Sequence, residues 1–343
     1  MKITVLMGGT SSERNVSLAS GIRIVQALRT RGHDVTPMDP ARGVISAAEE
    51  RELSMGKVGA EPPSLEALSK FAEGTFLPNL TGMKEIREAD VVFLALHGGQ
   101  GEDGTLQALL DMAHVKYTGS GHLSSALAMD KDLSKKLFRM DDVKTADWLM
   151  APVTTEQVEG MLGLPVIVKP SKQGSTVGLS LVKKREEIAT AIEEASKYDD
   201  EVMVEAFIPG RELTVGILGD IALPVGEIFP KHEIYDYECK YQPGMAVEEF
   251  PAKISPEQTK RAQDFARRAF DALKLRGCAR IDFRMAEDGE MYCLEANTLP
   301  GMTQTSLIPQ AAAAAGIDFP ALCERIVRLA LEAHPQDARG GIA

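Results

Sequence analysis

The strongest constraint on this chain is a hairpin signal in its last quarter. The runs RIDFRM and MYCLEAN both have the composition of strands, and AEDGE between them contains Asp-Gly at positions 288–289, a strong two-residue turn signal. A turn at these two residues places Asp282 opposite Glu295. It also places Arg280 opposite Asn297, and the period of two along a strand puts all four side chains on one face.

Two carboxylates that face each other destabilise a sheet unless a cation lies between them. Two carboxylates and an amide carbonyl are hard oxygen ligands, which suit magnesium better than zinc. The pattern therefore predicts that Asp282, Glu295 and Asn297 bind magnesium. The alternative is an edge hairpin with solvated acids, and the hairpin alone does not decide between the two.

The bulk properties narrow the class of protein. A chain of 343 residues exceeds a usual single core and should form two or three domains. Its formal net charge of −12 argues against nucleic-acid binding, so an anionic ligand would depend on local lysines, glycine amides and metal. No apolar run is long enough to cross a membrane, and the start MKITVLMGG is typical of a first strand instead of a signal peptide.

The cysteine pattern bears on the compartment. Four cysteines, at positions 239, 278, 293 and 323, form no CxxC pair. This favours a reduced, cytoplasmic setting and gives no indication of a zinc site. We therefore expect a cytoplasmic protein with neither nucleic-acid nor membrane partners.

The first third of the chain alternates strands and helices. ITVLMGG is followed by an apolar-periodic helix from about Val16 to a stop at Gly32, and then by the strand HDVTPMD. DVVFLALHGG is a continuous apolar run, as expected of a buried parallel strand. We expect a doubly wound α/β domain over residues 1–119, in which residues 41–89 form an elaboration with weak helices.

The rest of the chain predicts two α+β domains, over residues 120–208 and 209–343. Short strands TADWLMA, PVIVKP and LSLVKK are accompanied by a glycine-serine loop and the acidic helix REEIATAIEEASKY. The strands EVMVEAFI, RELTVGIL and DIALPVGEI, the loop KHEIYDYECKY, a capped helix from Ser255, the hairpin and a C-terminal helix follow.

Several motifs have both a functional and a structural interpretation. GQGEDG matches the dinucleotide fingerprint, but Glu102 and Asp103 would face a pyrophosphate with negative charge, so we interpret them as first-turn acids of their own helix. TSSE fits a capping box, or alternatively places Glu13 against a substrate ammonium. His97 follows a predicted parallel strand, at the end where α/β sheets bind ligands.

Three further segments suit a nucleotide. The loop KPSKQGSTVG, which begins at Lys169, lacks the Walker order but can close its amides over phosphates; a mobile surface hairpin is the alternative. Lys131 is either a phosphate contact or a solvated helix charge. In EAFIPGRE, Glu205 can contact an adenine amino group and Glu212 the ribose hydroxyls, although the signal is weak in isolation.

Taken in order, these pieces resemble the ATP-grasp superfamily and, most closely, its D-alanine–D-alanine ligase family. The matching segments are LMGGTSSERNVSL, LHGGQGEDGTLQ, MDK, VIVKPSKQGSTVG, EAFIPGRELTVG, YDYECKY, ARIDF and LEANTLPGMTQTSLIP. They span nearly the whole chain except residues 41–89, and such an ordered set is far more specific than any single motif. The resemblance implies an ATP-grasp fold, in which two α+β domains sandwich ATP beside an N-terminal Rossmann-like domain.

The resemblance also implies ligands for ATP and metal. The phosphates would be contacted by Lys131, Lys169 and Lys240. Adenosine would be held by Glu205, Ala206, Ile208 and Glu212, with Ala206 and Ile208 acting through their backbone. Two magnesium ions, for which manganese can substitute, would be bound by Asp282, Glu295 and Asn297.

The substrate side is implied in the same way. A triad of Glu13, Ser175 and Tyr241 would lie over the first D-alanine, with His97 beside the substrates. An oxyanion hole would be formed by Arg280 and the Gly301 amide. The second carboxylate would be held by Ser306 and the Leu307 amide.

The implied activity is ligation of two D-alanines through a D-alanyl phosphate, for peptidoglycan precursor synthesis by a cytoplasmic homodimer. Many members have Glu where Gln173 stands, which bears on loop closure, and Ser-His where Gln304 and Thr305 border the acceptor pocket. Tyr241 favours an amine acceptor, because relatives that use a hydroxy acid tend to have His in this loop. There are two alternatives. The protein could be another ATP-grasp carboxylate–amine ligase, or a regulatory protein that binds ATP without turnover.

Overall fold

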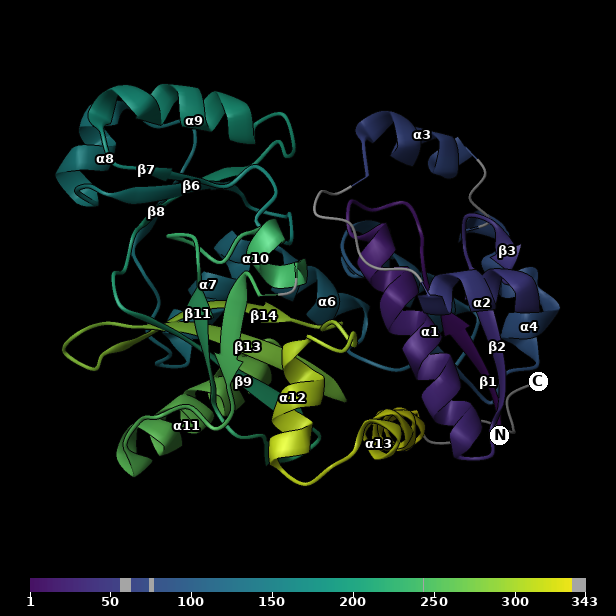
Figure 1. The fold of residues 1–343 in the computed structure, drawn as a ribbon. Coiled ribbons are helices and arrows are strands. Elements are labelled where there is room, and N and C mark those ends of the chain that lie inside the picture. Colours follow the sequence, from purple (N-terminus) through teal and green to yellow (C-terminus); the bar gives the residue numbers. More distant parts are fainter. Residues whose placement is uncertain (56–62, 74–76, 243, 335–343) are drawn as a thin grey trace, which may run out of the picture.

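The computed structural model describes residues 1–55, 63–73, 77–242 and 244–334. Three sheets organise the chain, and Figure 1 shows the N-terminal sheet with its helices beside the two sheets that follow it. Within the described ranges, no helix combines the length and the apolar character needed to span a membrane.

The N-terminal sheet has the order β3-β2-β1-β4. Its strands are β1 (Lys2–Leu6), β2 (Asp34–Asp39), β3 (Gly43–Val44) and β4 (Val91–Leu94). β1 pairs in parallel with β2 and with β4, as expected, whereas the short β3 is antiparallel to β2. The helices are α1 (Arg14–Thr30), α2 (Ala47–Met55), α3 (Leu65–Glu73), α4 (Lys84–Arg87) and α5 (Thr105–Met112), with 3-10 turns at Leu77–Gly82 and Gly99–Gly101.

Helix α1 shows how the pattern in the sequence becomes packing. Its buried positions include Val16, Ile22, Val25 and Leu28, which form one face against the sheet. The chain leaves the helix through Gly32, whose φ of 80° is the left-handed conformation that glycine accepts without cost. The capping box expected from TSSE is absent, because the helix begins at Arg14 and its N-cap residue makes no capping hydrogen bond with its side chain.

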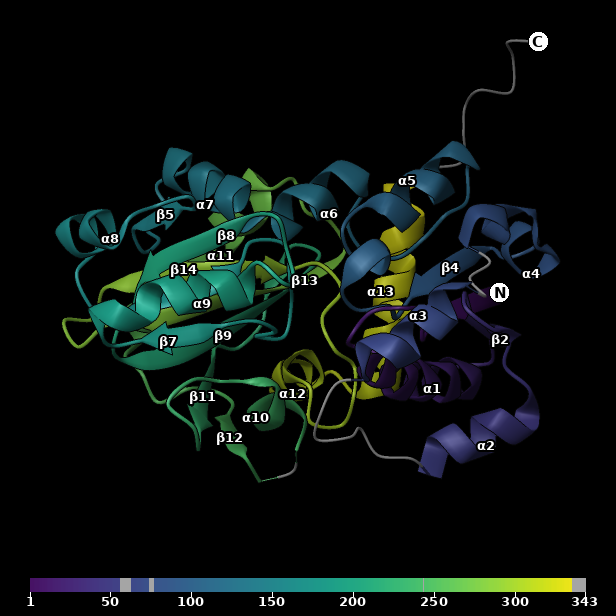
Figure 2. The ribbon, with the colours of Figure 1, turned by 90° about the horizontal axis from the view of Figure 1, so that it is seen from above.

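The second sheet is antiparallel, with the order β5-β8-β6-β7. Its strands are β5 (Trp148–Met150), β6 (Val166–Pro170), β7 (Ser180–Val182) and β8 (Val202–Ala206). Helices α8 (Thr155–Met161) and α9 (Ile188–Ala195) pack on this sheet, with a 3-10 turn at Arg185–Glu187. Helices α6 (His122–Met129) and α7 (Lys131–Met140) precede the sheet in the chain but pack on β14 of the third sheet. All the strands expected here from the sequence are therefore present, and α9 covers one face of them (Figure 2).

The third sheet is antiparallel and has the order β12-β11-β9-β13-β14, with β10 paired to β9. Its strands are β9 (Arg211–Leu218), β10 (Ile221–Ala222), β11 (Gly226–Pro230), β12 (Ala246–Glu249), β13 (Cys278–Met285) and β14 (Met291–Asn297). The helices are α10 (Tyr237–Tyr241), α11 (Pro256–Ala272), α12 (Leu307–Ala314) and α13 (Phe319–Ala333). The helix expected to be capped at Ser255 is present as α11, and its cap is a capping box that Ser255 forms with Gln258.

Two expectations for this part of the chain were wrong. The segment KHEIYDYECKY is not wholly a loop, because it contains α10, whose first turn is capped by Asp236. The single expected C-terminal helix is two helices, separated near Gly316 with a φ of 78°. In both cases a local capping or turn residue decided the structure, and the hydrophobic pattern did not reveal it.

The last helix returns to the beginning of the fold. Helix α13 lies beside α1 in Figures 1 and 2. One hydrophobic cluster includes Ile24 and Leu28 of α1 together with Leu322 and Val327 of α13. The C-terminal helix therefore packs on the N-terminal sheet and its helix, and so ties the two ends of the chain together.

The β13–β14 hairpin has the predicted pairs without the predicted turn. Asp282 faces Glu295 and Arg280 faces Asn297, as expected. Closer to the turn, the pairing is one residue out of the expected register. The loop contains three residues, 287–289, instead of two.

Two local irregularities cancel each other. Gly289 N donates to Ala286 O at 2.9 Å, and Gly289 has the left-handed φ of 82° that a three-residue hairpin loop requires. Beyond the loop a β-bulge makes Leu294 an extra residue in β14. The extra loop residue and the extra strand residue shift the register in opposite directions. For this reason the turn prediction was wrong and the prediction of the facing pairs was correct.

The loop assignment gives a testable stability difference. Gly289→Ala should lower the free energy of unfolding by about 1–2 kcal/mol, because a left-handed conformation costs a residue with a Cβ about that much. A Cβ there would approach only Gln258 Nε2, at 3.5 Å, so steric conflict adds little. Urea unfolding measures the change.

Gly160→Ala is the matched control. Gly160 lies within α8, and a Cβ at this position would meet nothing within 4 Å. The substitution should therefore raise the free energy of unfolding by up to about 1 kcal/mol. If both variants changed stability in the same direction, the left-handed loop at Gly289 would be contradicted.

Candidate active site

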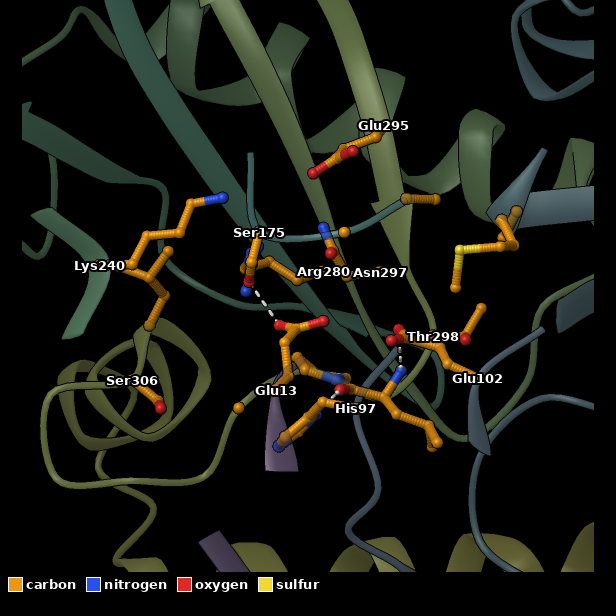
Figure 3. A pocket seen from close by; sticks show the side chains of 18 of the residues that line it. Glu13, His97, Glu102, Ser175, Lys240, Arg280, Glu295, Asn297, Thr298 and Ser306 are labelled. Carbon is orange, nitrogen blue, oxygen red and sulfur yellow. Dashed lines mark hydrogen bonds between the residues drawn. The ribbon is translucent and has the colours of Figure 1, made fainter. Parts of the chain in front are cut away.

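Two adjoining cavities lie between elements of the three sheets. One has a volume of about 850 Å³ and is lined in part by Glu13, His97 and Ser306, and the other has about 980 Å³ and is lined in part by Glu205 and Glu212. Both cavities are lined by Lys131, Gln173, Ser175, Tyr235, Lys240, Arg280 and Glu295. A ligand in one cavity would therefore lie against charged side chains that also face the other (Figure 3).

Asp282 is a buried residue that lines the second cavity and accepts hydrogen bonds from several donors. Arg280 contacts it twice, with Nε 2.9 Å from Oδ1 and Nη2 2.8 Å from Oδ2. Asn297 Nδ2 donates to Oδ2 at 3.0 Å, and Thr214 Oγ1 donates to Oδ1 at 2.7 Å. Thr214 was not predicted from the sequence, because only the pairing of β9 with β13 places it opposite Asp282.

Glu295 faces Asp282 and remains charged because of the lysines around it. Burial alone would raise the pKa of Glu295, but Lys131, Lys240 and other cations lower it to about 2. Lys131 Nζ lies 3.4 Å from Glu295 Oε2 and also donates to Gln173 O at 2.7 Å. The repulsion between the two acids is thus offset by surrounding positive charge.

The residues present fit a hard divalent cation. The carboxylates of Asp282 and Glu295 come from neighbouring strands that face one cavity, and Asn297 lies on the same face. Carboxylate and amide oxygens are the ligands that magnesium prefers. No thiol or imidazole belongs to this set, so its chemistry does not favour zinc.

Glu205 is held by two lysines instead of one. Lys169 Nζ donates to Glu205 Oε2 at 2.6 Å, and the buried Lys135 Nζ contacts Oε1. Although burial raises the pKa of Glu205, the two ammonium groups lower it to about 2. Lys135 was missed by the sequence analysis, although its spacing of four from Lys131 places both on one face of α7.

The other expected adenosine contacts lie along the same cavity. Arg284 Nη1 is 3.3 Å from Glu212 Oε2, and Arg284 Nε donates to Ile208 O at 3.1 Å. Burial raises the pKa of Glu212. Ala206 N donates to Asp147 O at 2.9 Å. Arg284 thus fixes two of the residues that were expected to meet the nucleoside, a role that the sequence did not indicate.

The glycine-serine loop reaches the N-terminal domain. The hydroxyl of Ser175 donates to Glu13 Oε1, as the dashed line in Figure 3 marks. Ser175 and Thr176 both have positive φ values, 49° and 60°, which residues other than glycine rarely adopt. Tyr241, the third member of the expected triad, belongs to α10, but its side chain lies outside what the structure describes.

His97 is fixed in a neutral state between two parts of the chain. Burial lowers the pKa of His97. Its Nδ1 lies 2.8 Å from Leu299 O and its Nε2 lies 3.3 Å from Ser20 Oγ. Because a carbonyl only accepts, Nδ1 carries the proton and Nε2 accepts from the serine. Ser20 was not singled out in the sequence, since one serine in a helix has no pattern that distinguishes it.

Glu102 does not lie in the first turn of α5, contrary to our expectation. The helix begins at Thr105, and the Glu102 carboxylate instead accepts from Gly98 N at 2.9 Å and from Leu299 N at 3.2 Å. Only Asp103 stabilises the helix start, through Thr105 N at 2.9 Å. Glu102 therefore joins the loop after β4 to the loop after β14, beside His97.

The expected acceptor residues lie together on the loop that precedes α12. Ser306 Oγ accepts from Thr303 N at 2.9 Å, and Leu307 is the first residue of α12. A Cβ on Gly301 would come within 2.8 Å of Ser306 Oγ, so only glycine fits without displacement.

Lys240 extends from α10 into the pocket, as Figure 3 shows, and its Nζ is 5.5 Å from the centre of the Tyr235 ring.

One cavity is lined by lysines from α7, β6 and α10 and by carboxylates from the third sheet. Together with the N-terminal parallel sheet, this architecture makes the chain an ATP-grasp enzyme. A family model described as "D-ala D-ala ligase N-terminus" matches residues 2–120, and one described as "D-ala D-ala ligase C-terminus" matches residues 131–328. The chain belongs to the D-alanine–D-alanine ligase family.

Individual relatives agree with this assignment. D-alanine–D-alanine ligase of Syntrophotalea carbinolica is 41% identical over 326 residues, 95% of each chain. That of Desulfotalea psychrophila is 42% identical over 342 residues, 97% of this chain and 95% of the relative. The solved enzyme from Coxiella burnetii superposes with a TM-score of 0.79 at 29% identity, covering 97% and 94% of the two chains. The Bacillus anthracis enzyme complexed with ATP gives 0.74 at 30% identity, covering 97% and 98%.

Glu102 gives a prediction about pH. Burial, and then the nearby Glu13 carboxylate, raise the pKa of Glu102 from 4.5 to about 7. Between these values the folded chain holds a proton that the unfolded chain has lost, so stability from this group falls as pH rises from about 4.5 to about 7. At 1.36 kcal/mol per pKa unit, the loss is on the order of 3 kcal/mol.

Glu102→Gln removes this dependence, because the amide is neutral throughout. Urea unfolding in the presence of a chelator should show that the unsubstituted protein loses more stability between pH 5 and pH 7.5 than the variant does. The pKa values of Glu205 and Glu295 are lowered to about 2, so these two groups change the stability only below about pH 4.5, outside the range of this comparison. Parallel pH profiles for the two proteins would rule out the elevated pKa.

Proposed function

We propose that this protein joins two D-alanine molecules into D-alanyl-D-alanine, with hydrolysis of ATP to ADP and phosphate. The observation that carries the proposal is the shared lining of the two cavities. Arg280, Glu295 and Lys131 face both of them, so a nucleotide phosphate in one cavity and a substrate carboxylate in the other would meet between these groups. The relatives reported above carry the name of this activity.

The larger cavity is the proposed nucleotide site. Its polar lining suits adenosine at Glu205, Ala206, Ile208 and Glu212, with the phosphates toward Lys131, Lys169 and Lys240. The solved ATP complex of the Bacillus anthracis relative supports ATP as the nucleotide. The loop that contains Ser175 would close over the phosphates and exclude water from the intermediate.

We propose that Asp282, Glu295 and Asn297 hold two magnesium ions, for which manganese can substitute. When bound, these ions would neutralise negative charge on the phosphates and hold them in line with the attacking oxygen. The protein supplies the rest of the positive charge through the three lysines and Arg280.

The first step is attack of a D-alanine carboxylate oxygen on the γ-phosphorus of ATP. A D-alanyl phosphate forms as the bond to the β-phosphate oxygen breaks and ADP leaves. Glu13, hydrogen-bonded to Ser175, would receive the ammonium group of this D-alanine, and Tyr241 is the proposed third member of that triad. His97 lines the same cavity and would lie beside the substrates.

The second step is attack of the deprotonated amine of the other D-alanine on the acyl carbon. Its carboxylate would bind Ser306 and the Leu307 amide. Arg280 uses Nε and Nη2 on Asp282, which leaves Nη1 to donate with the Gly301 amide to the tetrahedral oxyanion. The nitrogen then loses a proton to solvent, the carbon–oxygen bond to phosphate breaks, and inorganic phosphate leaves with the dipeptide.

The wider setting is also proposed. The product is a precursor of peptidoglycan, made in the cytoplasm by a homodimer. We further propose three domains, over residues 1–119, 120–208 and 209–343, with α13 packed on the first of them. The departures at Gln173, Gln304 and Thr305 border the closing loop and the acceptor side, where they would modulate closure and the preference for the second substrate.

Phosphate release from ATP and magnesium tests the function directly. D-alanine should release phosphate with formation of D-alanyl-D-alanine, identified by mass, whereas L-alanine, glycine and D-lactate should not. Release with a different acid or amine would preserve the ligase mechanism and overturn the substrate. ATP binding without release for any substrate would overturn catalysis itself.

Asp282→Asn tests the metal assignment. The variant retains the size and several hydrogen bonds of the side chain but loses its charge, so turnover should fall by at least about 100-fold through the loss of several kcal/mol of charge stabilisation. The magnesium concentration that gives half of the maximal rate should rise as well. Steady-state rates over a range of magnesium concentrations measure both effects.

Asp264→Asn is the control for this substitution. Asp264 lies on α11 in an exposed pair with Lys260, and such pairs contribute little. Its rate and magnesium dependence should equal those of the unsubstituted protein. An Asp282→Asn variant with near-normal turnover at limiting magnesium would exclude Asp282 as a ligand.

A further inference from the structure

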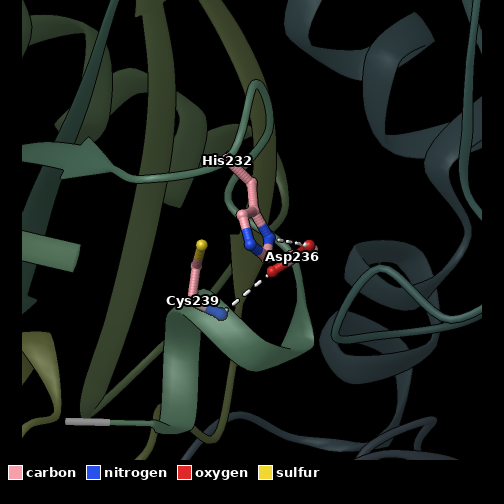
Figure 4. Close-up of side chains that lie close together, drawn as sticks. All are labelled: His232, Asp236 and Cys239. Carbon is pink, nitrogen blue, oxygen red and sulfur yellow. Dashed lines mark hydrogen bonds and ion pairs between the residues drawn. The ribbon is translucent and has the colours of Figure 1, made fainter. Parts of the chain in front are cut away.

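The segment that carries Lys240 also brings together three metal-ligating side chains that have no part in the proposed reaction. His232, Asp236 and Cys239 lie in the segment between β11 and β12, and one ligand atom from each lies within 4.8 Å of the other two. Among the residues that the structure describes, this is the only such group of three histidine, cysteine, aspartate or glutamate side chains. In Figure 4 the imidazole lies between the carboxylate of Asp236 and the thiol of Cys239.

Asp236 is hydrogen-bonded to both of the other residues. His232 Nδ1 donates to Asp236 Oδ2 at 2.6 Å, and Asp236 Oδ1 accepts from the backbone amide of Cys239, Cys239 N, at 2.9 Å. These two contacts hold the carboxylate next to the imidazole, at the start of the helix that carries the thiol.

The charges of the three ligands balance one divalent cation. Neutral imidazole, carboxylate and thiolate together carry two negative charges, so the site with the cation bound has no net charge. The thiol proton leaves to solvent as the metal–sulfur bond forms, together with any proton on the ligating imidazole nitrogen, and the buried thiolate is not left uncompensated.

We propose that His232, Asp236 and Cys239 bind one divalent cation of the zinc class, with water as the fourth ligand. A nitrogen, an oxygen and a sulfur ligand favour zinc and exclude magnesium as the preferred ion. The side chains of His232 and Asp236 are 39% and 32% exposed, so an ion can enter from solvent. Cys239 is 2% exposed and would hold the ion from the protein side.

The position of this site connects it to the cavities. Tyr235 and Lys240, which line both cavities, lie in the same loop as the three ligands. An ion bound to His232, just after β11, and to Cys239 of α10 would join the two ends of this loop segment. Zinc would therefore restrict the motion of the segment that places Lys240. The spacing H-x3-D-x2-C contains no CxxC, which is why the cysteine pattern did not indicate it.

Cobalt(II) binding to the full chain in excess magnesium tests the proposal. Cobalt takes the place of zinc and reports thiolate ligation by a sulfur-to-metal charge-transfer band in the near ultraviolet. One equivalent of cobalt should produce this band, and one equivalent of zinc should abolish it. Cobalt at the oxygen ligands Asp282 and Glu295 gives no such band, so the two sites are distinguishable.

Three variants complete the experiment. Cys239→Ala should lose the charge-transfer band, and His232→Ala should bind zinc at least about tenfold more weakly, as loss of a metal-supporting group typically does. His122→Ala is the matched control, because His122 Nδ1 lies 2.9 Å from Asp111 Oδ2 in a pair without a thiol; its zinc affinity should be unchanged. Cobalt binding without the band, a band that persists in Cys239→Ala, or equal zinc affinity in His232→Ala would each overturn the proposal.

Discussion

The electrostatic balance around Asp282 and Glu295 is the constraint on which the rest of the site depends. Asp282 is buried and the Glu295 side chain is only partly exposed, so two carboxylates that face each other on neighbouring strands repel each other more strongly than they would in water. Arg280 compensates the first through two hydrogen bonds, and Lys131 with other cations compensates the second. Arg280 lies in the same sheet as the two acids, Lys131 begins α7, and Lys169, another of the cations around Glu295, comes from β6 of the second sheet, so part of the compensation crosses between the sheets. Fold and charge compensation are therefore parts of one arrangement.

The sequence could predict those parts of the site that depend on local patterns, and it could not predict contacts between distant segments. The hairpin was recognised because alternation and a turn signal are local properties of the chain. Its facing pairs were correct even though the turn had one more residue than expected, since the bulge at Leu294 restored the register. No local pattern indicates a bulge of this kind. Residues such as Thr214 and Arg284 escaped detection because their partners are fixed by strand pairing between distant segments.

The remaining differences between the predicted and the observed structure depend on which partners the side chains find in the folded chain. Glu102 has the sequence context of a first-turn acid, but its carboxylate finds two amides on separate loops, and tertiary contacts override the local preference. Lys135 follows the amphipathic spacing of α7, yet a buried lysine is expected only once its carboxylate partner is known. Resemblance to a family supplied roles for the site residues, whereas the contacts that orient those residues came from the structure. These supporting residues were the larger part of what sequence reasoning missed.

The packing of α13 against α1 has a consequence for how the chain is made. Residues of both helices belong to one hydrophobic cluster, although about 300 positions separate them along the chain. During synthesis the N-terminal sheet and α1 emerge early, but α13, which supplies part of their core, is made only after all the residues between the two helices. Until then the apolar side of α1 that α13 covers is open to solvent and to other chains. This core can therefore close only after the segments that form the other two sheets have been synthesised.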